Sequence, residues 1–101
     1  MSVTEPYVPV VREVVEGYDD RWLSMKIIWE EIRMHHPDIA KKITAHISEY
    51  ESGQTEAWFL HQVCRVIGNE EGFEFNKSRD HDNIHLNDEN GLIRNNKRKA
   101  T

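Results

Sequence analysis

The chain has 101 residues, enough for one domain with a modest core, and its 38% hydrophobic and 31% charged residues are typical of a globular rather than a disordered protein. No apolar run approaches the ~20 residues of a membrane span, and a single cysteine excludes an internal disulfide, so we expect a cytoplasmic protein without a membrane partner. The formal net charge is −5, with 7 Lys and Arg against 14 Asp and Glu in residues 1–75 and 6 against 4 in residues 76–101.

This uneven charge predicts an acidic helical domain over residues 1–75 and a polar, basic-ended extension over residues 76–101. An acidic body repels phosphate backbones, because nucleic-acid affinity depends on Lys and Arg. The acidic surface either serves mainly to keep the chain soluble or meets a protein partner with a basic face. The basic residues from Arg94 to Lys99 have two interpretations. They form an arm that contacts phosphate or an acidic partner, or they form a tail that keeps the chain soluble.

The first two predicted helices come from apolar residues at helical spacing. Pro9 suits the first turn of one helix, and Gly17 marks its end. Asp19 or Asp20 is expected to cap the second helix, which ends at His35-His36-Pro37 because the residue before a proline avoids the α region. A wide buried face is predicted for this second helix, with Trp22 and Trp29 in the core and two stripes formed by Met25, Ile28, Trp29 and Ile32, and by Leu23, Ile27 and Met34.

Two further helices follow, one beginning at Pro37 and the other near Thr55, whose hydroxyl can cap it. Ser52-Gly53 separates them, and Gly68-Asn69 ends the last one. Four helices with short connections predict a compact, mainly α fold in a single domain. The residues expected to be buried are Ala40, Ile43, Ile47 and Tyr50 in the third helix and Phe59, Leu60, Val63, Cys64, Val66 and Ile67 in the fourth.

Beyond residue 69, alternating side chains replace the helical period. Two short strands between Ile84 and Arg94, around Asp88-Glu89-Asn90-Gly91, predict a small C-terminal β-hairpin, because Asn-Gly is a common hairpin turn. A disordered tail is the alternative for this Asn- and Asp-rich stretch.

Residues that carry chemistry are sparse. His61-x2-Cys64 followed by His81-x3-His85 approximates the spacing of a zinc site. Cys64 occupies an apolar position of its helix, however, where a thiol is buried and inert, so we expect neither a metal nor a cofactor. The chain has no Gly-rich phosphate loop, no G-x-S-x-G and no H-E-x-x-H, and its adjacent carboxylates diverge on a helix. We therefore expect no enzymatic activity.

One stretch carries a recognisable pattern. Ile39-Ala40-Lys41-Lys42-Ile43, Ile47-Ser48-Glu49-Tyr50-Glu51-Ser52-Gly53 and the later Leu60, Val63, Val66, Ile67 and Gly68 lie within residues 39–68. This stretch resembles part of the lambda-repressor/Cro-type (XRE) helix-turn-helix family, in which similar segments form the second helix, the end of the recognition helix and the helix behind it. The resemblance implies a DNA-binding transcriptional regulator, with contacts from Lys41, Lys42, His46 and Ser48.

The chain departs from that family at Thr44-Ala45-His46, where the family has a turn and the first half of the recognition helix. The alternative is one uninterrupted amphipathic helix over residues 37–51, with Ser48 and Glu49 outward and Ile47 and Tyr50 inward.

By elimination, the sequence predicts a small non-catalytic binding or regulatory protein. It resembles inhibitors, adaptors and antitoxin-like proteins, including phage-encoded ones, and would dock an acidic helical face on a protein partner. The sequence also allows a homodimer. Trp58, Tyr7, Glu49 and Glu51 are the predicted contact residues, with burial of Trp58 in the core as the alternative.

Overall fold

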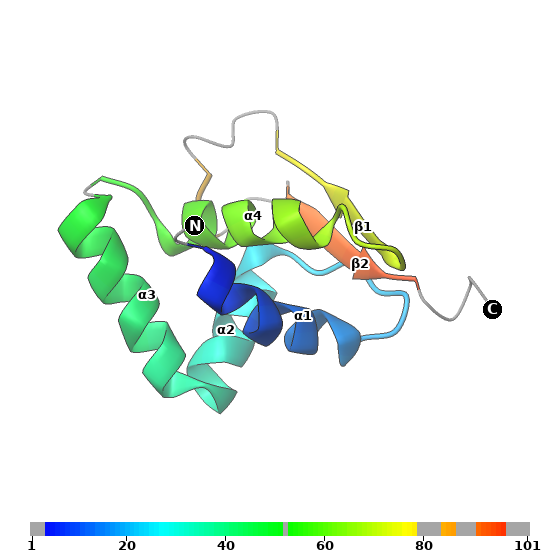
Figure 1. Cartoon of the computed structure of the whole chain (residues 1–101), viewed down its shortest axis with the longest axis horizontal. Coiled ribbons are helices and arrows are strands. Elements are labelled where there is room, and N and C mark those ends of the chain that lie inside the picture. Colours follow the sequence, from blue (N-terminus) through cyan, green and yellow to red (C-terminus); the bar gives the residue numbers. More distant parts are fainter. Residues whose placement is uncertain (1–3, 52, 79–83, 87–90, 97–101) are drawn as a thin grey trace.

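A computed structural model of the protein describes residues 4–51, 53–78, 84–86 and 91–96 (Figure 1). The described part is mainly α and is completed by a small antiparallel β-hairpin, as the sequence predicts. The elements in chain order are a 3-10 turn η1 (Glu5–Tyr7), α1 (Val8–Glu16), α2 (Met25–His35), α3 (Pro37–Tyr50), α4 (Glu56–Ile67), β1 (Phe73–Asn76) and β2 (Leu92–Asn95).

Most helix ends lie where local residues predict them. Gly17 follows α1, and Pro37 is the first residue of α3. The Thr55 hydroxyl accepts a hydrogen bond from the backbone N–H of Trp58 at 3.1 Å and so caps α4, which ends at Gly68. These ends were predictable because each depends on residues within a few positions of the boundary.

The predicted cap of α2 is wrong. Ser24, rather than Asp19 or Asp20, caps this helix, and its Oγ accepts from the N–H of Ile27 at 3.3 Å. The backbone N–H of Asp20 donates instead to the carbonyl of Asn95 at 2.8 Å, and the φ of Asp20 is 54°. Pairing with β2 therefore keeps this segment out of the helix, because a residue with positive φ does not fit a helical turn.

The core lies between the helices and beneath the hairpin. α4 packs against α1, α2, α3 and β1, while α3 stands at one edge of the molecule and packs mainly against α2 and α4 (Figure 1). The stripe from Met25 to Ile32 is buried as predicted. The second stripe is only partly correct: Leu23 is fully buried but precedes α2, Ile27 is half-buried, and Met34 is 71% exposed. One stripe suffices because α1, α3 and α4 reach only one side of α2.

Three other residues predicted to be buried are exposed. Trp22 is 38% exposed because it precedes α2 and lies against the guanidinium of Arg94, 4.5 Å from the ring centroid. Tyr50 is 67% exposed because it ends α3, beyond the part covered by other elements, where its ring contacts His46. Val66 is 45% exposed on the solvent side of α4. Apolar periodicity gives an incorrect prediction at these positions because the packed elements do not bury them.

The hairpin does form, but with a different first strand. β2 pairs with β1, with Phe75 opposite Ile93, whereas Ile84 to Leu86 belongs to no strand. The predicted turn at residues 88–90 lies outside the described residues. Ile93 also exchanges backbone hydrogen bonds with Leu23 at 2.8 and 3.0 Å, and it is fully buried. Ile84 and Ile93, from the predicted extension over residues 76–101, thus belong to the same core as the helices.

Candidate functional site

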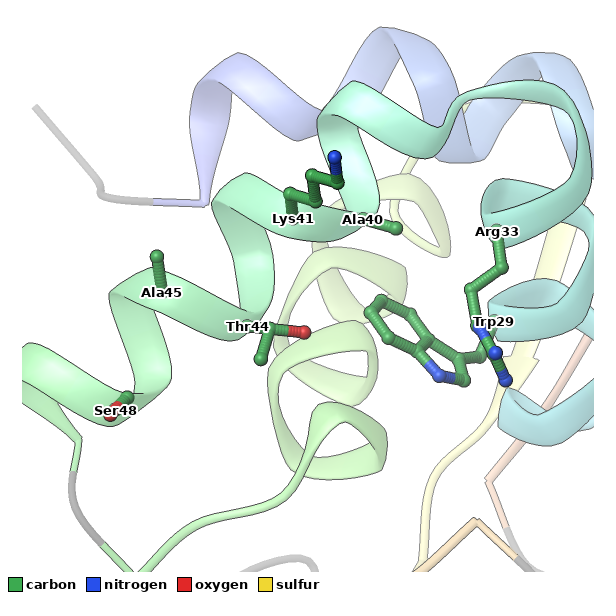
Figure 2. Close-up of a pocket in the computed structure, with 7 residues that line it drawn as sticks. All are labelled: Trp29, Arg33, Ala40, Lys41, Thr44, Ala45 and Ser48. Carbon is green, nitrogen blue, oxygen red and sulfur yellow. The ribbon is translucent and has the colours of Figure 1, made fainter.

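An open groove of about 470 Å³ separates α2 from α3 (Figure 2). Its lining is mostly apolar surface, with two cationic side chains and two hydroxyls among the lining residues. Pockets that bind ligands have volumes of roughly 300–1,000 Å³, so the groove has the size of a binding site. The lining residues are Trp29 and Arg33 from α2, and Ala40, Lys41, Thr44, Ala45 and Ser48 from α3.

The groove exists because small side chains on α3 face a large one on α2. Ala40, Thr44 and Ser48 are four residues apart, which places them in one row along the helix. The methyl group of Ala40 and the hydroxyl of Thr44 point toward the indole of Trp29 (Figure 2). These short side chains do not fill the space in front of the ring. The indole therefore forms the floor of the groove while remaining only 7% exposed.

The charges of the groove differ from those of the chain as a whole. Arg33 lies in the last turn of α2, four residues after Trp29, and its side chain runs beside the indole (Figure 2). Lys41 lies on α3 across the groove. Both are exposed, and neither forms an ion pair with another residue that the structure describes. A chain with a net charge of −5 thus has a positive rim at this groove.

Sequence reasoning missed this site, although a signal was present. Trp29 was predicted as a core residue, which is correct, and Ser48 as an outward residue, which is also correct. The four-residue spacing of Ala40, Thr44 and Ser48 indicates a shallow helix face. Only the packing of α3 beside α2 places that face opposite an indole.

The residues predicted to contact a protein partner lie elsewhere. Trp58 is half-buried and packs against the core, and Tyr7 makes an edge contact with Phe59 at a centroid distance of 5.2 Å. Glu49 is exposed at the end of α3, and Glu51 is half-buried just after it. None of these four predicted residues lines the α2–α3 groove.

Only some of the residues predicted to contact DNA lie at the groove. Lys41 and Ser48 line the groove, and Lys42 is exposed outside it. His46 packs between Tyr50 and Phe59, at centroid distances of 5.1 and 5.6 Å, and its buried Nε2 has no hydrogen-bond partner among the described residues. His46 is therefore engaged in packing on the side of α3 that faces α4.

α3 is one helix from Pro37 to Tyr50 and has no turn at residues 44–46. The structure thus confirms the uninterrupted helix, with Ile47 buried and Ser48 and Glu49 exposed as predicted, but the helix ends one residue earlier and the inward position predicted for Tyr50 is wrong, since Tyr50 is 67% exposed. The family resemblance itself stays a prediction.

Two residues of the predicted zinc site, His61 and Cys64, are fully buried on α4. Nε2 of His61 accepts a hydrogen bond from the backbone N–H of Ser78 at 3.0 Å, and burial raises the pKa of the Cys64 thiol. Metal binding needs a deprotonated thiolate, which this environment disfavours. His85 is exposed, and His81 lies outside the described residues. Within residues 4–51, 53–78, 84–86 and 91–96, no three metal-binding side chains come together.

A second, smaller hollow of about 150 Å³ lies where the end of α1 meets the end of α2. Here the hydroxyl of Tyr18 donates to a carboxylate oxygen of Glu31 at 2.5 Å, and this hydrogen bond raises the pKa of Tyr18. The other carboxylate oxygen lies 3.4 Å from Nε2 of His35. Glu31 thus connects the two helix ends, which gives it and His35 a structural role in this hollow.

No described helix combines the length and the apolar character that a membrane crossing needs. No family model, curated protein or solved structure matches the chain.

Proposed function

We propose that this chain is a small non-catalytic binding protein that docks on a protein partner through the α2–α3 groove and the adjoining face of α3. The groove itself is the observation that carries the proposal. It holds an indole floor, four small side chains and two cations on neighbouring helices. Surfaces of this kind bind protein segments by burying a few apolar side chains against an aromatic anchor.

The shape of the groove favours a protein segment over a small molecule. Small-molecule pockets enclose most of the surface of their ligand. The α2–α3 groove is open along the two helices, so it would leave a compact ligand largely in water. An extended segment or a helix can instead follow the groove, with apolar side chains entering it at intervals of three or four residues.

DNA binding is the second candidate, and the exposed Lys41 and Lys42 on α3 favour it. Asp38 and Glu49 are exposed on the same helix, however, and the acidic body as a whole repels phosphate. A partner with a basic face, which the net charge predicts, also stays untested. The local charge of the groove is positive, and contacts at short range decide recognition once salt screens charges beyond about 10 Å.

Affinity capture with the full chain tests the proposed function. Thr44→Trp places a large side chain in the groove at an exposed position, and Lys26→Trp places the same side chain at an exposed position of α2 outside it. We expect the wild-type chain and Lys26→Trp to retain a stoichiometric protein partner that Thr44→Trp loses. Circular dichroism checks that both variants fold.

Trp58→Ala, in the same experiment, tests the contact predicted from the sequence. Loss of the partner with Trp58→Ala but not with Thr44→Trp would move the interface from the groove to α4. Capture of no protein at all would contradict the proposed function.

A further inference from the structure

We infer that the α2–α3 groove binds an acidic amphipathic segment of a partner protein, with an apolar side chain against Trp29 and carboxylates beside Arg33 and Lys41. This inference rests on the proposed function and specifies the chemistry of the partner. The net charge of the chain predicts a basic partner, whereas the positive rim of the groove predicts an acidic one.

The apolar part of the partner follows from the floor of the groove. The indole of Trp29 and the methyl groups of Ala40 and Ala45 line it, and water against this surface gains few hydrogen bonds. A leucine, methionine or aromatic side chain that displaces this water buries apolar area on both partners. Thr44 and Ser48 lie on the same side of α3, where their hydroxyls can meet polar groups of the segment.

The acidic part follows from the two exposed cations that line the groove. Arg12 donates two hydrogen bonds to Glu70, at 2.9 and 2.7 Å, and Arg94 donates to Glu74 at 2.7 Å while lying 4.5 Å from the centre of the Trp22 ring. Both of these guanidinium groups have carboxylate partners within the chain, whereas Arg21 and Arg65 have none among the described residues. Arg33 forms no ion pair within the described residues, although the chain has an excess of carboxylates.

Lys41, across the groove, forms no such pair either. Carboxylates of a second protein would bind these two cations, because a carboxylate forms paired hydrogen bonds with Arg and is attracted by the positive charge of Lys. A basic segment would place like charges together at the rim, which costs binding free energy.

A displayed library of random peptides of about 14 residues, four helical turns in length, provides the probe. The full chain is the target, and the peptides that bind best are synthesised with a fluorophore and titrated by fluorescence anisotropy. We expect the selected peptides to combine Asp or Glu with apolar residues three or four positions apart. Their affinity should fall as salt is raised, because the rim charges are exposed.

Two variants with the same change of net charge distinguish an effect of the groove cations from an effect of the net charge of the chain. Arg33→Glu with Lys41→Glu reverses the rim, and Arg65→Glu with Lys26→Glu reverses two exposed helix residues outside it. Arg33 and Arg65 both lie in the last turn of their helices, so the reversals affect the helix ends equally. The rim reversal should weaken the acidic peptide by about tenfold or more, whereas the control should change its affinity by less than about threefold.

The rescue experiment gives the sharpest result. A peptide with Lys in place of each Glu should recover binding to the Arg33→Glu/Lys41→Glu variant, and Thr44→Trp should abolish binding of both peptides. Selected peptides without acidic residues, no selected peptides, or acidic peptides that bind the rim variant equally well would each overturn the inference.

Affinity capture judges the proposed function separately, because a partner lost with Thr44→Trp supports it whatever the charge of that partner. A homodimer that Thr44→Trp converts to a monomer would assign the groove to a second copy of the chain and overturn the inference. Retention of a DNA duplex that depends on Arg33 and Lys41 would overturn it as well.

Discussion

Gly68 illustrates how a single residue determines the packing of the hairpin. It ends α4 at the point where Phe75 of β1 crosses the helix. A Cβ at this position would lie 2.5 Å from the Cβ of Phe75 and 3.2 Å from the carbonyl oxygen of Cys64. Because the Cβ of Phe75 is fixed by its backbone, the clash cannot be relieved by a rotamer change.

We therefore expect Gly68→Ala to lower the free energy of unfolding by about 1–3 kcal/mol. A thermal melt should show a loss of roughly 4–8 °C for each kcal/mol in a domain of this size. Gly17→Ala is the matched control, because Gly17 also ends a helix with negative φ and its added Cβ would meet only carbonyl oxygens, the nearer at 3.3 Å. Equal losses in the two variants would contradict the steric explanation.

Cys64 shows what burial does to a reactive group. The thiol is fully buried, and desolvation of the thiolate raises its pKa. The folded state therefore favours the protonated form, and this contribution to stability is complete below about pH 8.5 and is lost as the pH rises further. At pH 8 we expect a chromogenic disulfide reagent to leave the folded protein unmodified and to react with one thiol when guanidinium unfolds it. Immediate reaction of the folded protein would contradict the buried position.

Among the elements, β2 decides whether the C-terminal part of the chain belongs to the fold. Ile93 of β2 is fully buried and exchanges backbone hydrogen bonds with Leu23, and β2 contacts α1 as well as β1. We expect Ile93→Ala to lower the free energy of unfolding by about 2–5 kcal/mol in a urea titration, because it leaves a cavity in the core.

Val66→Ala is the matched control for Ile93→Ala. Val66 is 45% exposed on α4, so its truncation should cost less than about 1 kcal/mol. A disordered tail, the alternative that the sequence allowed, predicts no effect of Ile93→Ala.

At the scale of the whole molecule, the charge distribution bears on the choice between protein and DNA. The chain has a net charge of −5, and the exposed cations on α3, Lys41 and Lys42, share the helix with the exposed acidic residues Asp38 and Glu49. We expect no retardation of a DNA duplex in a gel at an ionic strength of about 0.01 M, where electrostatic attraction is strongest. Retardation with a steep salt dependence, weakened by Lys41→Ala with Lys42→Ala, would favour the helix-turn-helix interpretation instead.

The predicted elements differ in how far they could be derived from the sequence. The boundaries at Gly17, Pro37 and Thr55 were predictable because capping and proline geometry involve neighbouring residues. The cap of α2 was not, because an Asp before a helix is a good cap unless a distant strand pairs with its backbone. In this protein Asn95 does so.

The candidate site was less predictable than the fold. Trp29, Ala40 and Ser48 were each assigned the correct degree of burial, yet the groove that they share was not predicted. A groove is the space left between two elements, so it depends on their relative placement as well as on their side chains. Arg33 had no distinguishing feature in the sequence, because whether a cation is paired depends on residues far along the chain.

By itself, the sequence determined four helices, their main buried stripe and the acidic character of the chain, since periodicity, capping and charge are local properties. Only the tertiary structure decided that β2 pairs with β1, that Trp22 lies on Arg94 rather than in the core, and that small residues of α3 face Trp29. The physical reason is that each of these contacts joins segments that are distant in the sequence. The packing of the whole core decides which of these segments meet, and no local pattern encodes that packing.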